Sequence, residues 1–274
     1  MMVVALMVGS CAQSEKPLRV MSFNIRNSGM ASDSGDCKWM NRRDAVVKMI
    51  NEEQPAVIGM QEALPDQLAF LSETLAQYDY IGVGRDDGDK EGEVMAIFYR
   101  NDLLEVKESG TFWLSETPDE VSLGWDGACR RTCTWAVMQA KQGGNKFLFL
   151  NTHLDHVGDT ARTEAIKLIV KKFDMLAKEG MPVFLTADFN SDTDEERFGV
   201  LKAAMNDARK DCDPTDNGPT FNEWGKALER NVRIDHIFYK NAKPASFKVI
   251  RDNKYGVEYI SDHFPVVFDC ILCN

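Results

Sequence analysis

The stretch TWAVMQAKQGGNKFLFLNT (residues 134–152) contains two mainly apolar runs separated by the turn residues Gly143, Gly144 and Asn145. Short apolar runs on either side of a glycine-containing turn are typical of a β-hairpin. Alternating or buried runs elsewhere predict further strands. These strands are expected over residues 18–25, 57–62, 94–100, 183–187, 233–239 and 263–271.

Three segments have the apolar periodicity of amphipathic helices, namely residues 41–53, 65–76 and 160–178. The predicted strands outnumber the helices that could cover them one by one. Several neighbouring strands are also joined by hairpins, not by crossover helices. The sequence therefore predicts an α/β fold with two packed β-sheets and helices outside them, in preference to a doubly wound parallel sheet.

The composition is that of a soluble globular protein, because 44% of the 274 residues are hydrophobic and 27% are charged. The formal net charge of −11 disfavours a protein that coats nucleic acid, since non-specific binding to the phosphate backbone depends on clustered cations. The same charge does not exclude a small phosphorylated substrate held locally. Beyond residue 17 there is no linker or repeat, so residues 18–274 are expected to form a single domain.

The first eleven residues form a short apolar run that ends in Val8-Gly9-Ser10-Cys11, which resembles a bacterial lipobox. We expect residues 1–17 to be a signal segment and tether. The chain is then an exported monomer, located in the periplasm or cell envelope and attached to the membrane only by a lipid at Cys11. The other six cysteines allow many disulfide pairings, and none has the neighbours of a zinc site.

Polar residues of the kinds that bind metal or transfer protons occur repeatedly at the ends of the predicted strands. Carboxylate and amide oxygens with few histidines suit Mg²⁺ or Mn²⁺ better than zinc or copper. Mg²⁺ usually keeps open positions that substrate phosphates occupy, so this residue set predicts a phosphorylated substrate. The residues are Asn24, Glu62, His153, Asp188, Asn190, Asp235, Asp262 and His263.

The motifs that contain these residues resemble, in order, those of the endonuclease/exonuclease/phosphatase superfamily, and of a bacterial exported subgroup distantly related to the messenger-RNA deadenylases. The resemblance covers about residues 18–271 and implies a deoxyribonuclease-like four-layer α/β/β/α sandwich with two mixed sheets. The motifs are Ser22-Phe23-Asn24-Ile25-Arg26, Gln61-Glu62, Asn151-Thr152-His153-Leu154-Asp155, Ala187-Asp188-Phe189-Asn190, Arg233-Ile234-Asp235-His236-Ile237 and Ser261-Asp262-His263-Phe264-Pro265-Val266.

The resemblance also implies roles for individual residues. Glu62 is the expected main Mg²⁺ (or Mn²⁺) ligand, assisted by Asn24 and Asp262. His263, oriented by Asp235, is expected to accept a proton from the attacking water. On the opposite side, His153 is expected to stabilise the phosphoryl group, with Glu93 as its carboxylate partner. Asp188 and Asn190 are expected to position the nucleophile and a phosphate oxygen, or to bind a second metal ion.

Candidate substrate contacts are less specific. Arg26, Arg131 and His156 are candidates for phosphate binding. For the two arginines, the reason is that a guanidinium group matches phosphate geometry. Arg42, Arg85 and Arg162 are further candidates, whereas His236 is interpreted as structural. Three of the five tryptophans lie within residues 110–135, which we interpret as a loop. There Trp125 either stacks on a substrate ring or anchors the loop, and both alternatives remain open.

Three functions are compatible with these patterns. The first is a metal-dependent phosphodiesterase or phosphatase acting on a small phosphorylated molecule, and the acidic composition favours it. The second is a nuclease acting on DNA or RNA, for which the sequence offers no Lys/Arg-rich stripe. The third is an inactive module that binds glycans at the cell surface. The presence of Glu62, His153, Asp188 and His263 argues against an inactive module.

Overall fold

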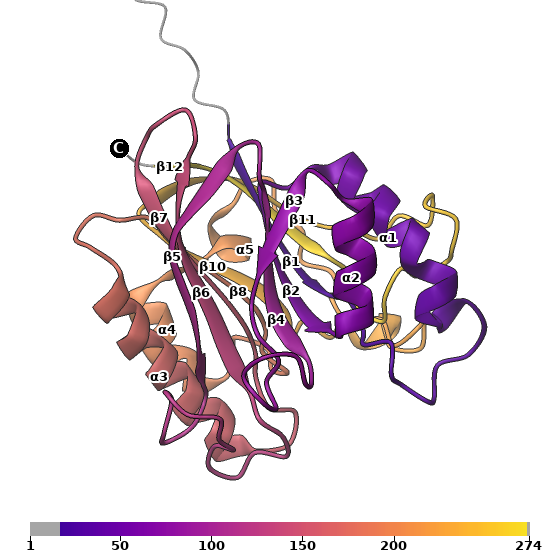
Figure 1. Ribbon diagram of the computed structural model, residues 1–274, viewed down its shortest axis with the longest axis horizontal. Helices are drawn as coiled ribbons and strands as arrows, with labels where there is room; N and C mark the ends of the chain where they lie inside the picture. The colour runs from indigo at the N-terminus through magenta and orange to yellow at the C-terminus, as the bar shows by residue number, and fades with distance from the viewer. Residues whose placement is uncertain (1–16, 273–274) are drawn as a thin grey trace, which may run out of the picture.

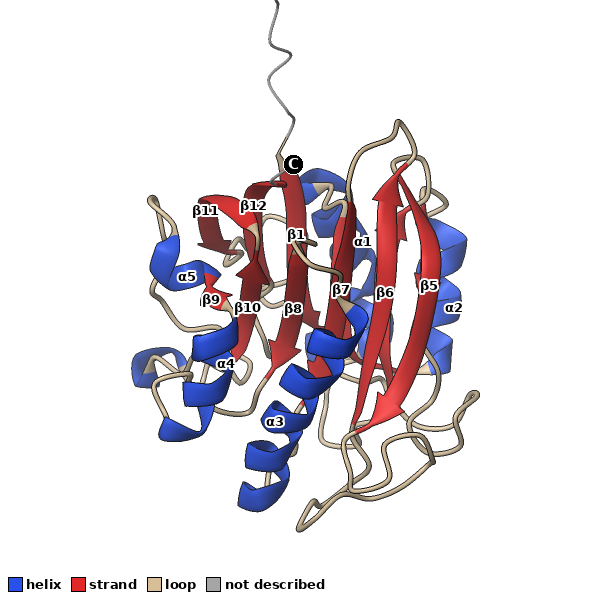
Figure 2. Ribbon diagram, turned by 90° about the vertical axis from the view of Figure 1, so that its left-hand side faces the viewer, coloured by secondary structure: helices blue, strands red, loops and turns tan. Residues whose placement is uncertain are grey.

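The computed structural model describes residues 17–272 and shows two six-stranded β-sheets stacked face to face. Figures 1 and 2 show the sheets in the middle of the molecule with helices on both outer faces. The first sheet has the order β11 (Ala242–Val249), β12 (Val266–Leu272), β1 (Leu18–Asn24), β2 (Val57–Ala63), β4 (Val94–Arg100) and β3 (Tyr78–Ile81). The second has the order β5 (Leu104–Trp113), β6 (Thr132–Ala140), β7 (Lys146–His153), β8 (Val183–Asp188), β10 (Asp235–Lys240) and β9 (Asn206–Asp207).

The helices lie on the outer faces of the sheets. Helices α1 (Trp39–Glu53) and α2 (Pro65–Thr74) cover the first sheet, while α3 (Asp159–Leu176) and α4 (Gly199–Ala204) cover the second (Figure 1). The result is the predicted four-layer α/β/β/α sandwich. The remaining helical segments are the short helix α5 (Ala208–Asp211) and the 3₁₀ turns Gly35–Cys37, Glu196–Phe198 and Leu228–Arg230.

Strand pairing follows the hairpin pattern of the sequence. Strands β6 and β7 form the expected antiparallel hairpin. Only the pairs β1–β2 and β7–β8 are parallel within the described residues, and a helix connects the strands of each pair. Parallel neighbours need such crossovers, whereas antiparallel neighbours need only a turn. Because the chain has few long helices that could serve as crossovers, most strand pairs are antiparallel and both sheets are mixed.

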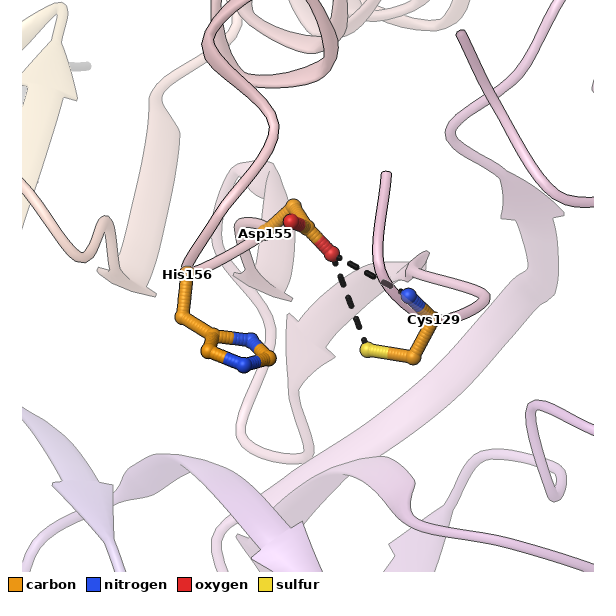
Figure 3. Close-up of side chains that lie close together, drawn as sticks. All are labelled: Cys129, Asp155 and His156. Atoms are coloured by element: carbon orange, nitrogen blue, oxygen red, sulfur yellow. Dashed lines mark hydrogen bonds between the residues drawn. The ribbon is translucent and has the colours of Figure 1, made fainter. Parts of the chain in front are cut away.

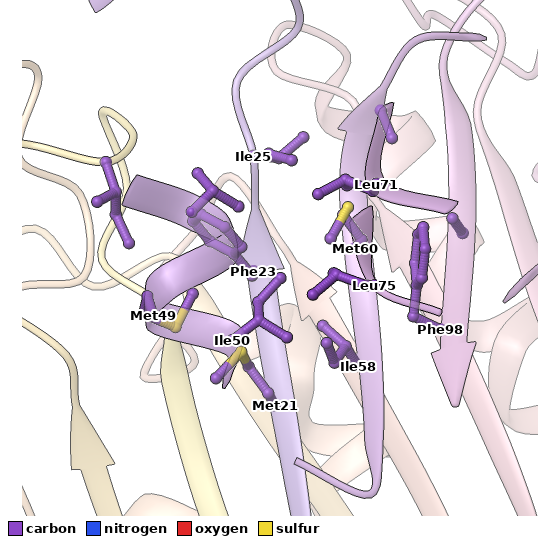
Figure 4. Close-up of a cluster of buried hydrophobic side chains, with 14 of the residues drawn as sticks. Met21, Phe23, Ile25, Met49, Ile50, Ile58, Met60, Leu71, Leu75 and Phe98 are labelled. Carbon is purple, nitrogen blue, oxygen red and sulfur yellow. The ribbon is translucent and has the colours of Figure 1, made fainter. Parts of the chain in front are cut away.

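Alternation along the strands divides the apolar residues between an outer and a central layer. On β1, Met21 and Phe23 face α1 and α2, and Figure 4 shows them packed with Ile50 and Leu75. Val20, one residue away, faces the second sheet instead. Successive side chains of a strand point to opposite faces, so one strand contributes to both layers.

The two sheets approach closely below the rim where the polar motifs end. A Cβ atom placed on Gly59 of β2 would lie 1.8 Å from Thr186 Oγ1 of β8, so only glycine fits there. Beside it, Gln61 Nε2 donates to Asn151 Oδ1 at 2.7 Å, and Asn151 Nδ2 donates to the carbonyl of Met60 at 2.8 Å. These buried polar contacts connect the sheets and fix their alignment.

The structure corrects the sequence interpretation at four strands. No strand was predicted over β3, β5, β9 or β11, and residues 110–135 were interpreted as a loop. Residues up to Trp113 belong instead to β5, and Trp135 lies on β6, so the loop spans only residues 114–131. Strand β5 lies at a sheet edge and is exposed in its middle, which weakens its hydrophobic signal. Strand β11 contains Pro244, which edge strands tolerate and which obscures a strand pattern.

Some predictions concern residues that the structure does not describe. The signal segment and Cys11 lie outside residues 17–272 and remain predictions. Within the described range, no helix is both long and apolar enough to cross a bilayer. Cys37, Cys129, Cys133 and Cys212 are free thiols.

Candidate active site

The polar residues at the strand ends gather at one rim of the sandwich. In the second sheet, the last residue of β7 (His153), the last of β8 (Asp188) and the first of β10 (Asp235) lie side by side in the strand register. In the first sheet, β1 ends at Asn24 next to the Gln61-Glu62 segment of β2. Asn24 Nδ2 donates to Asp188 Oδ2 at 2.8 Å, which connects the two sheets at the site.

Glu62 lies in a β-bulge. The register between β2 and β4 shifts by one residue between Met60 and Ala63, and Glu62 has a φ of +62°. A bulge re-aims a side chain relative to its strand, and here it directs the carboxylate toward the rim. Asn24 Nδ2 donates to Glu62 Oε1 at 3.0 Å, and the backbone and side-chain amides of Asn27 donate to Oε2 at 3.1 and 3.2 Å.

Asn24 is oriented with its amide nitrogen toward the carboxylates. Its Oδ1 accepts a hydrogen bond from the Arg26 backbone at 3.0 Å. A metal ligand must present oxygen, so Asn24 serves as a ligand only if its amide group rotates by half a turn. Asp262 is also occupied, because its Oδ2 lies 3.2 Å from Arg26 Nη1. Arg26, predicted to bind phosphate, is therefore paired with Asp262 and with Asp33 at 3.0 Å.

His263 and Asp235 form the expected pair. His263 Nδ1 lies 2.9 Å from Asp235 Oδ2, and its other ring nitrogen, Nε2, lies 3.7 Å from Asp188 Oδ2. Thr220 Oγ1 accepts hydrogen bonds from the backbone amides of Ile234 and Asp235, both at 3.0 Å, which holds the start of β10 in place. Both residues of the pair are buried, so the imidazole has one fixed orientation.

His153 lies on the other side of Asp188. Its Nε2 is 3.4 Å from Asp188 Oδ2 and 2.9 Å from Asn190 Nδ2. Asn190 has a φ of +49° and its side chain also donates to the Leu154 carbonyl at 2.9 Å. Non-glycine residues with positive φ are uncommon and often occur at functional sites, as Arg26 (φ +58°), Glu62 and Asn190 do here.

Burial and crowded charges shift the acidities of this site. Burial, with repulsion from Asp235, raises the pKa of Asp188 to about 7. Burial and the charge of Glu62 also raise the pKa of Asp262. Burial favours a raised pKa for Glu62 too, but hydrogen bonds from Asn24 and the charge of His263 outweigh it, so that pKa falls below its ordinary value.

The pKa values of the two imidazoles shift in opposite directions. Burial disfavours the charged form of His263, but Asp235 and Asp188 outweigh it and raise the pKa of His263 to about 10. Burial, with the charges of Arg131 and His263, lowers the pKa of His153 well below its ordinary value. Near neutral pH and without a bound cation, His153 is therefore a neutral hydrogen-bonding group, whereas His263 is protonated.

The donor set fits a hard divalent cation. Ligand atoms of Glu62, His153 and Asp188 all lie within 4.8 Å of one another, as do those of Asp188, Asp235 and His263. Carboxylates this close and this buried repel one another unless positive charge lies among them, as the raised pKa of Asp188 shows. The predicted ligands Glu62 and Asn24 lie in this cluster, whereas Asp262 contacts Arg26 at its edge.

Glu93 does not contact His153 as expected. Its Oε1 accepts from Asn27 Nδ2 at 3.2 Å, and its Oε2 pairs with Arg85. Within residues 17–272, His153 Nδ1 is buried without a hydrogen-bond partner. Burial and the charge of Glu62 raise the pKa of Glu93. Arg85 takes this carboxylate from within the same connection between β3 and β4, where its backbone amide donates to the Glu93 carbonyl at 3.1 Å, and the motif pattern did not indicate this pairing.

Arg131 and His156 lie together beside the site, with Arg131 Nη2 3.2 Å from His156 Nδ1. Figure 3 shows the adjoining cluster of Cys129, Asp155 and His156. The ligand atoms of these three residues lie close enough to suggest a metal site. However, Asp155 Oδ2 already accepts from the Ala128 and Cys129 amides at 3.0 and 3.3 Å, and Oδ1 from Val157 and Gly158. Asp155 therefore connects the loop of Ala128 and Cys129 to that of Val157 and Gly158, and both of its oxygens already have hydrogen-bond donors.

The other candidate substrate residues serve structural roles. Trp125 is half-buried against the core below α3, which supports its role as a loop anchor. Arg42 is fully buried and donates to the carbonyls of Ile25 and Arg26 at 2.7 Å. Arg162 donates to the Asp155 carbonyl at 3.0 Å. Arg42 thus holds the chain after β1 and does not contact substrate.

Several residues that shape the site were missed by sequence reasoning. Asn27 bridges Glu62 and Glu93, and Ser261 Oγ donates to the Asn24 carbonyl at 2.7 Å. The ring of Phe221 lies 4.9 Å from that of His263. Ser261 was quoted only as part of a motif. Asn27 and Phe221 follow no periodic pattern, so only the folded chain reveals their contacts.

His236 is structural, as predicted. It is buried, its Nε2 lies 3.1 Å from the Arg233 carbonyl, and its ring stacks on Phe189 with centroids 5.6 Å apart. Burial and the charge of Arg209 lower the pKa of His236 to about 3. The folded protein therefore keeps this imidazole neutral well below the pH at which an unfolded chain protonates it.

This depressed pKa predicts an acid-sensitive contribution to stability. Above about pH 6.5, the pKa of this histidine in the unfolded chain, His236 is neutral in both states and the free energy of unfolding keeps its full value. As the pH falls from there toward 3, only the unfolded chain takes up the proton, and the free energy of unfolding decreases by about 1.4 kcal/mol per pH unit. His236→Phe should remove this decrease. Urea unfolding of both proteins at pH 7 and pH 5 should show a smaller loss of free energy of unfolding in the variant, by about 2 kcal/mol. Equal losses in the two proteins would contradict this assignment.

A model of the Endonuclease/Exonuclease/phosphatase family matches residues 21–263, which includes every strand-end residue of the site. The chain belongs to this family. Its members include phosphatases and nucleases with this sandwich fold, so the chain is a hydrolase acting on phosphate esters. The predicted fold and family are thereby confirmed.

Individual members of the Endonuclease/Exonuclease/phosphatase family align over most of the chain. A mannosyl-6-phosphatase of Bacteroides thetaiotaomicron is 36% identical, covers 93% of this chain and 100% of its own, and has a TM-score of 0.87. A Bacteroides vulgatus family member is 35% identical, with coverages of 94% and 100% and a TM-score of 0.87. Nocturnin of Drosophila melanogaster is 25% identical, over 84% of this chain and 42% of its own length.

Proposed function

We propose that this chain is a divalent-metal-dependent phosphomonoesterase that releases phosphate from a small sugar phosphate. The observation that carries the proposal is the buried Asp188 carboxylate, placed between the imidazoles of His153 at 3.4 Å and His263 at 3.7 Å. On one side of Asp188, His263 can accept a proton, and on the other side His153 can bind the phosphoryl group. The sugar phosphate is supported by the mannosyl-6-phosphatase that is 36% identical over nearly the whole chain.

Water attack is assigned to the His263 side. A cation bound at Asp188 would offset the charge of this carboxylate and so lower the pKa of His263, which is about 10 without it. The neutral imidazole then donates Nδ1–H to Asp235 and leaves Nε2, on the Asp188 side, as the proton acceptor. His263 Nε2 accepts the proton of the attacking water, and Asp235 stabilises the imidazolium that forms. Such a positioned base typically contributes about 10²–10⁴-fold in rate.

Binding of the phosphoryl group is assigned to the His153 side. The depressed pKa of His153 keeps the imidazole neutral, and Asn190 Nδ2 holds it at 2.9 Å. Both hydrogens of Asn190 Nδ2 are used, by His153 and by the Leu154 carbonyl. The buried Arg131 has no hydrogen-bond partner for Nε and Nη1 within residues 17–272, so its guanidinium is the donor that suits phosphate oxygens. Phosphoryl transfer depends mainly on such positioning and charge stabilisation.

Glu62 and Asp188 would hold the divalent cation, with Asn24 contributing its oxygen after rotation of the amide. When bound, Mg²⁺ or Mn²⁺ neutralises the buried carboxylates and stabilises negative charge on the phosphate. Export of the protein and lipid attachment at Cys11 form a separate part of this proposal, and they rest on the sequence alone.

We expect EDTA to reduce phosphate release by more than about 100-fold, and added Mg²⁺ or Mn²⁺ to restore it, because the cation offsets the repulsion among the buried carboxylates. Phosphate release before and after dialysis, followed by titration with each metal, measures this. An enzyme that keeps full activity after EDTA treatment would exclude the metal-dependent mechanism.

The substrate class is tested by a panel assayed with Mg²⁺. The panel contains mannose 6-phosphate, nitrophenyl phosphate, bis(nitrophenyl) phosphate, a phospholipid and single-stranded and duplex DNA and RNA. We expect the highest kcat/KM for the sugar monoester. Faster cleavage of nucleic acid would instead establish the nuclease alternative, which the net charge of −11 disfavours. Faster cleavage of the diester or phospholipid would identify a phosphodiesterase.

A further inference from the structure

The loop from Thr220 to Ala227 lies beside the candidate active site and has an unusual backbone. Three consecutive residues have positive φ values, namely Glu223 (+49°), Trp224 (+57°) and Gly225 (+88°). A bulky residue such as tryptophan rarely adopts this conformation. It persists where the surrounding contacts enforce it, and such residues cluster at functional sites.

Asn222 enforces this conformation and attaches the loop to the site. Its backbone amide donates to the Asp262 carbonyl at 2.8 Å, and its Nδ2 donates to the Ser261 carbonyl at 3.1 Å. Its Oδ1 accepts from the Trp224 amide at 2.8 Å, while the Glu223 amide donates to the Asp262 carbonyl at 3.1 Å. The position of Trp224 is therefore fixed relative to Asp262 and to His263, the next residue.

The Trp224 side chain is not needed to fill the core. It is half-buried and belongs to none of the three buried hydrophobic clusters within residues 17–272. Its ring contacts the buried Arg42, with Cζ 5.6 Å from the ring centroid. Arg42 in turn donates to the carbonyl of Arg26, the residue that pairs with Asp262. The indole is thus connected to Asp262 through Arg42 and Arg26.

The surroundings of Trp224 match the chemistry of a sugar ring. A pyranose has an apolar C–H face, which packs on an aromatic ring, and hydroxyl groups at its edge, which bind charged planar groups. At the preceding residue of the loop, the Glu223 carboxylate forms an exposed ion pair with the Arg230 guanidinium, and this pair offers both an acceptor and a donor for hydroxyl groups. Flat apolar surface with a few polar groups is the usual composition of a site for small ligands.

We propose that Trp224 stacks on the hexose ring of the substrate while its phosphate binds at the rim formed by His153, Asp188 and His263. The proposal rests on the phosphomonoesterase function proposed above and adds a residue that selects the leaving group. Trp224 is a positioning residue, because it contacts the sugar and not the reacting atoms. The strained loop then has a function, which is to present this ring at a fixed place beside Asp262.

The test compares a substrate that has a ring with one that does not. Trp224→Ala should raise KM for mannose 6-phosphate by roughly tenfold, since a stacked aromatic contributes about that much to binding. The ratio of kcat/KM for mannose 6-phosphate to that for glycerol 3-phosphate should fall by a similar factor. Trp224→Phe keeps an aromatic face and should retain most of the preference.

Trp39 provides the matched control. It is buried and also contacts Arg42, with Cζ 5.2 Å from its ring centroid. Trp39→Leu should therefore weaken the support of Arg42 and lower kcat/KM for both substrates by equal factors. If Trp224→Ala behaves in the same way, Trp224 only covers Arg42 and the proposal is wrong. A greater effect on adenosine 5′-phosphate than on mannose 6-phosphate would overturn the assignment to sugars.

The wild-type protein separates the two proposals. Absence of turnover with both mannose 6-phosphate and glycerol 3-phosphate would refute the proposed phosphatase, and the stacking proposal with it. Turnover of glycerol 3-phosphate alone would refute the sugar ring as leaving group while leaving a phosphatase. Turnover of both with an unchanged ratio in Trp224→Ala would refute only the stacking.

Discussion

His263→Ala should lower kcat for phosphate ester hydrolysis by about 1,000-fold, with KM changing only a few-fold. The expected loss is large because Nδ1 of this imidazole is held by Asp235 at 2.9 Å, which leaves Nε2 to accept a proton. A group that acts on the transition state changes kcat more than substrate binding. Steady-state kinetics with mannose 6-phosphate in excess Mg²⁺ measure both constants.

Two further variants show whether the loss at His263 is chemical. Asp235→Asn keeps the shape of the side chain but removes the charge that orients the ring, and should also lower kcat by at least about 100-fold. His236→Phe changes another buried histidine, which faces away from the reacting groups, and should retain the wild-type kcat. Full turnover by folded His263→Ala protein would eliminate this residue as the base.

Glu62→Gln should weaken binding of Mg²⁺ by at least about 100-fold and reduce activity at ordinary Mg²⁺ concentrations accordingly. The carboxylate is directed toward the rim by the β-bulge in β2 and accepts hydrogen bonds from Asn24 and Asn27. Glutamine preserves its size but removes the negative charge that a hard cation requires. Calorimetric titration of Mn²⁺ and the Mg²⁺ dependence of kcat/KM report the effect.

Glu53→Gln is the matched control for Glu62. Glu53 is also a buried, ion-paired glutamate, but its partners are Arg19 and Lys248, away from the rim. Its substitution should reduce stability while leaving the Mg²⁺ dependence unchanged. Equal Mg²⁺ affinity in Glu62→Gln and wild-type protein would show that the cation is held elsewhere.

Glu62 and Glu93 show which features of the site can be predicted from the sequence and which cannot. Both are glutamates near a strand end, and the motif pattern assigned both to the site. Their residue types and order were sufficient to predict a site of hard oxygen ligands. Which group each carboxylate contacts depends on Asn27, which follows β1, and on Arg85, which lies opposite Glu93 in the connection between β3 and β4. The expected contact between Glu93 and His153 was wrong for this reason.

Trp113 and Trp224 show a similar limit for aromatic residues. Trp113 was interpreted as part of a loop beside the substrate, but it lies on the edge strand β5, which is too exposed to give a clear hydrophobic alternation. Trp224 was not singled out by the sequence. Its place beside the site follows from Asn222, whose contacts with Ser261 and Asp262 span about forty residues.

The fold class, eight of the twelve strands within residues 17–272 and the chemical character of the site could be predicted from the sequence. These features could be predicted because apolar alternation and turn residues determine local structure. The residue type also indicates whether a side chain can be buried or can bind a cation. The bulge at Glu62, the close approach of the sheets at Gly59 and the pairing of Asp262 with Arg26 could be seen only in the folded chain. These features depend on distances between segments far apart in the chain, which no local pattern encodes.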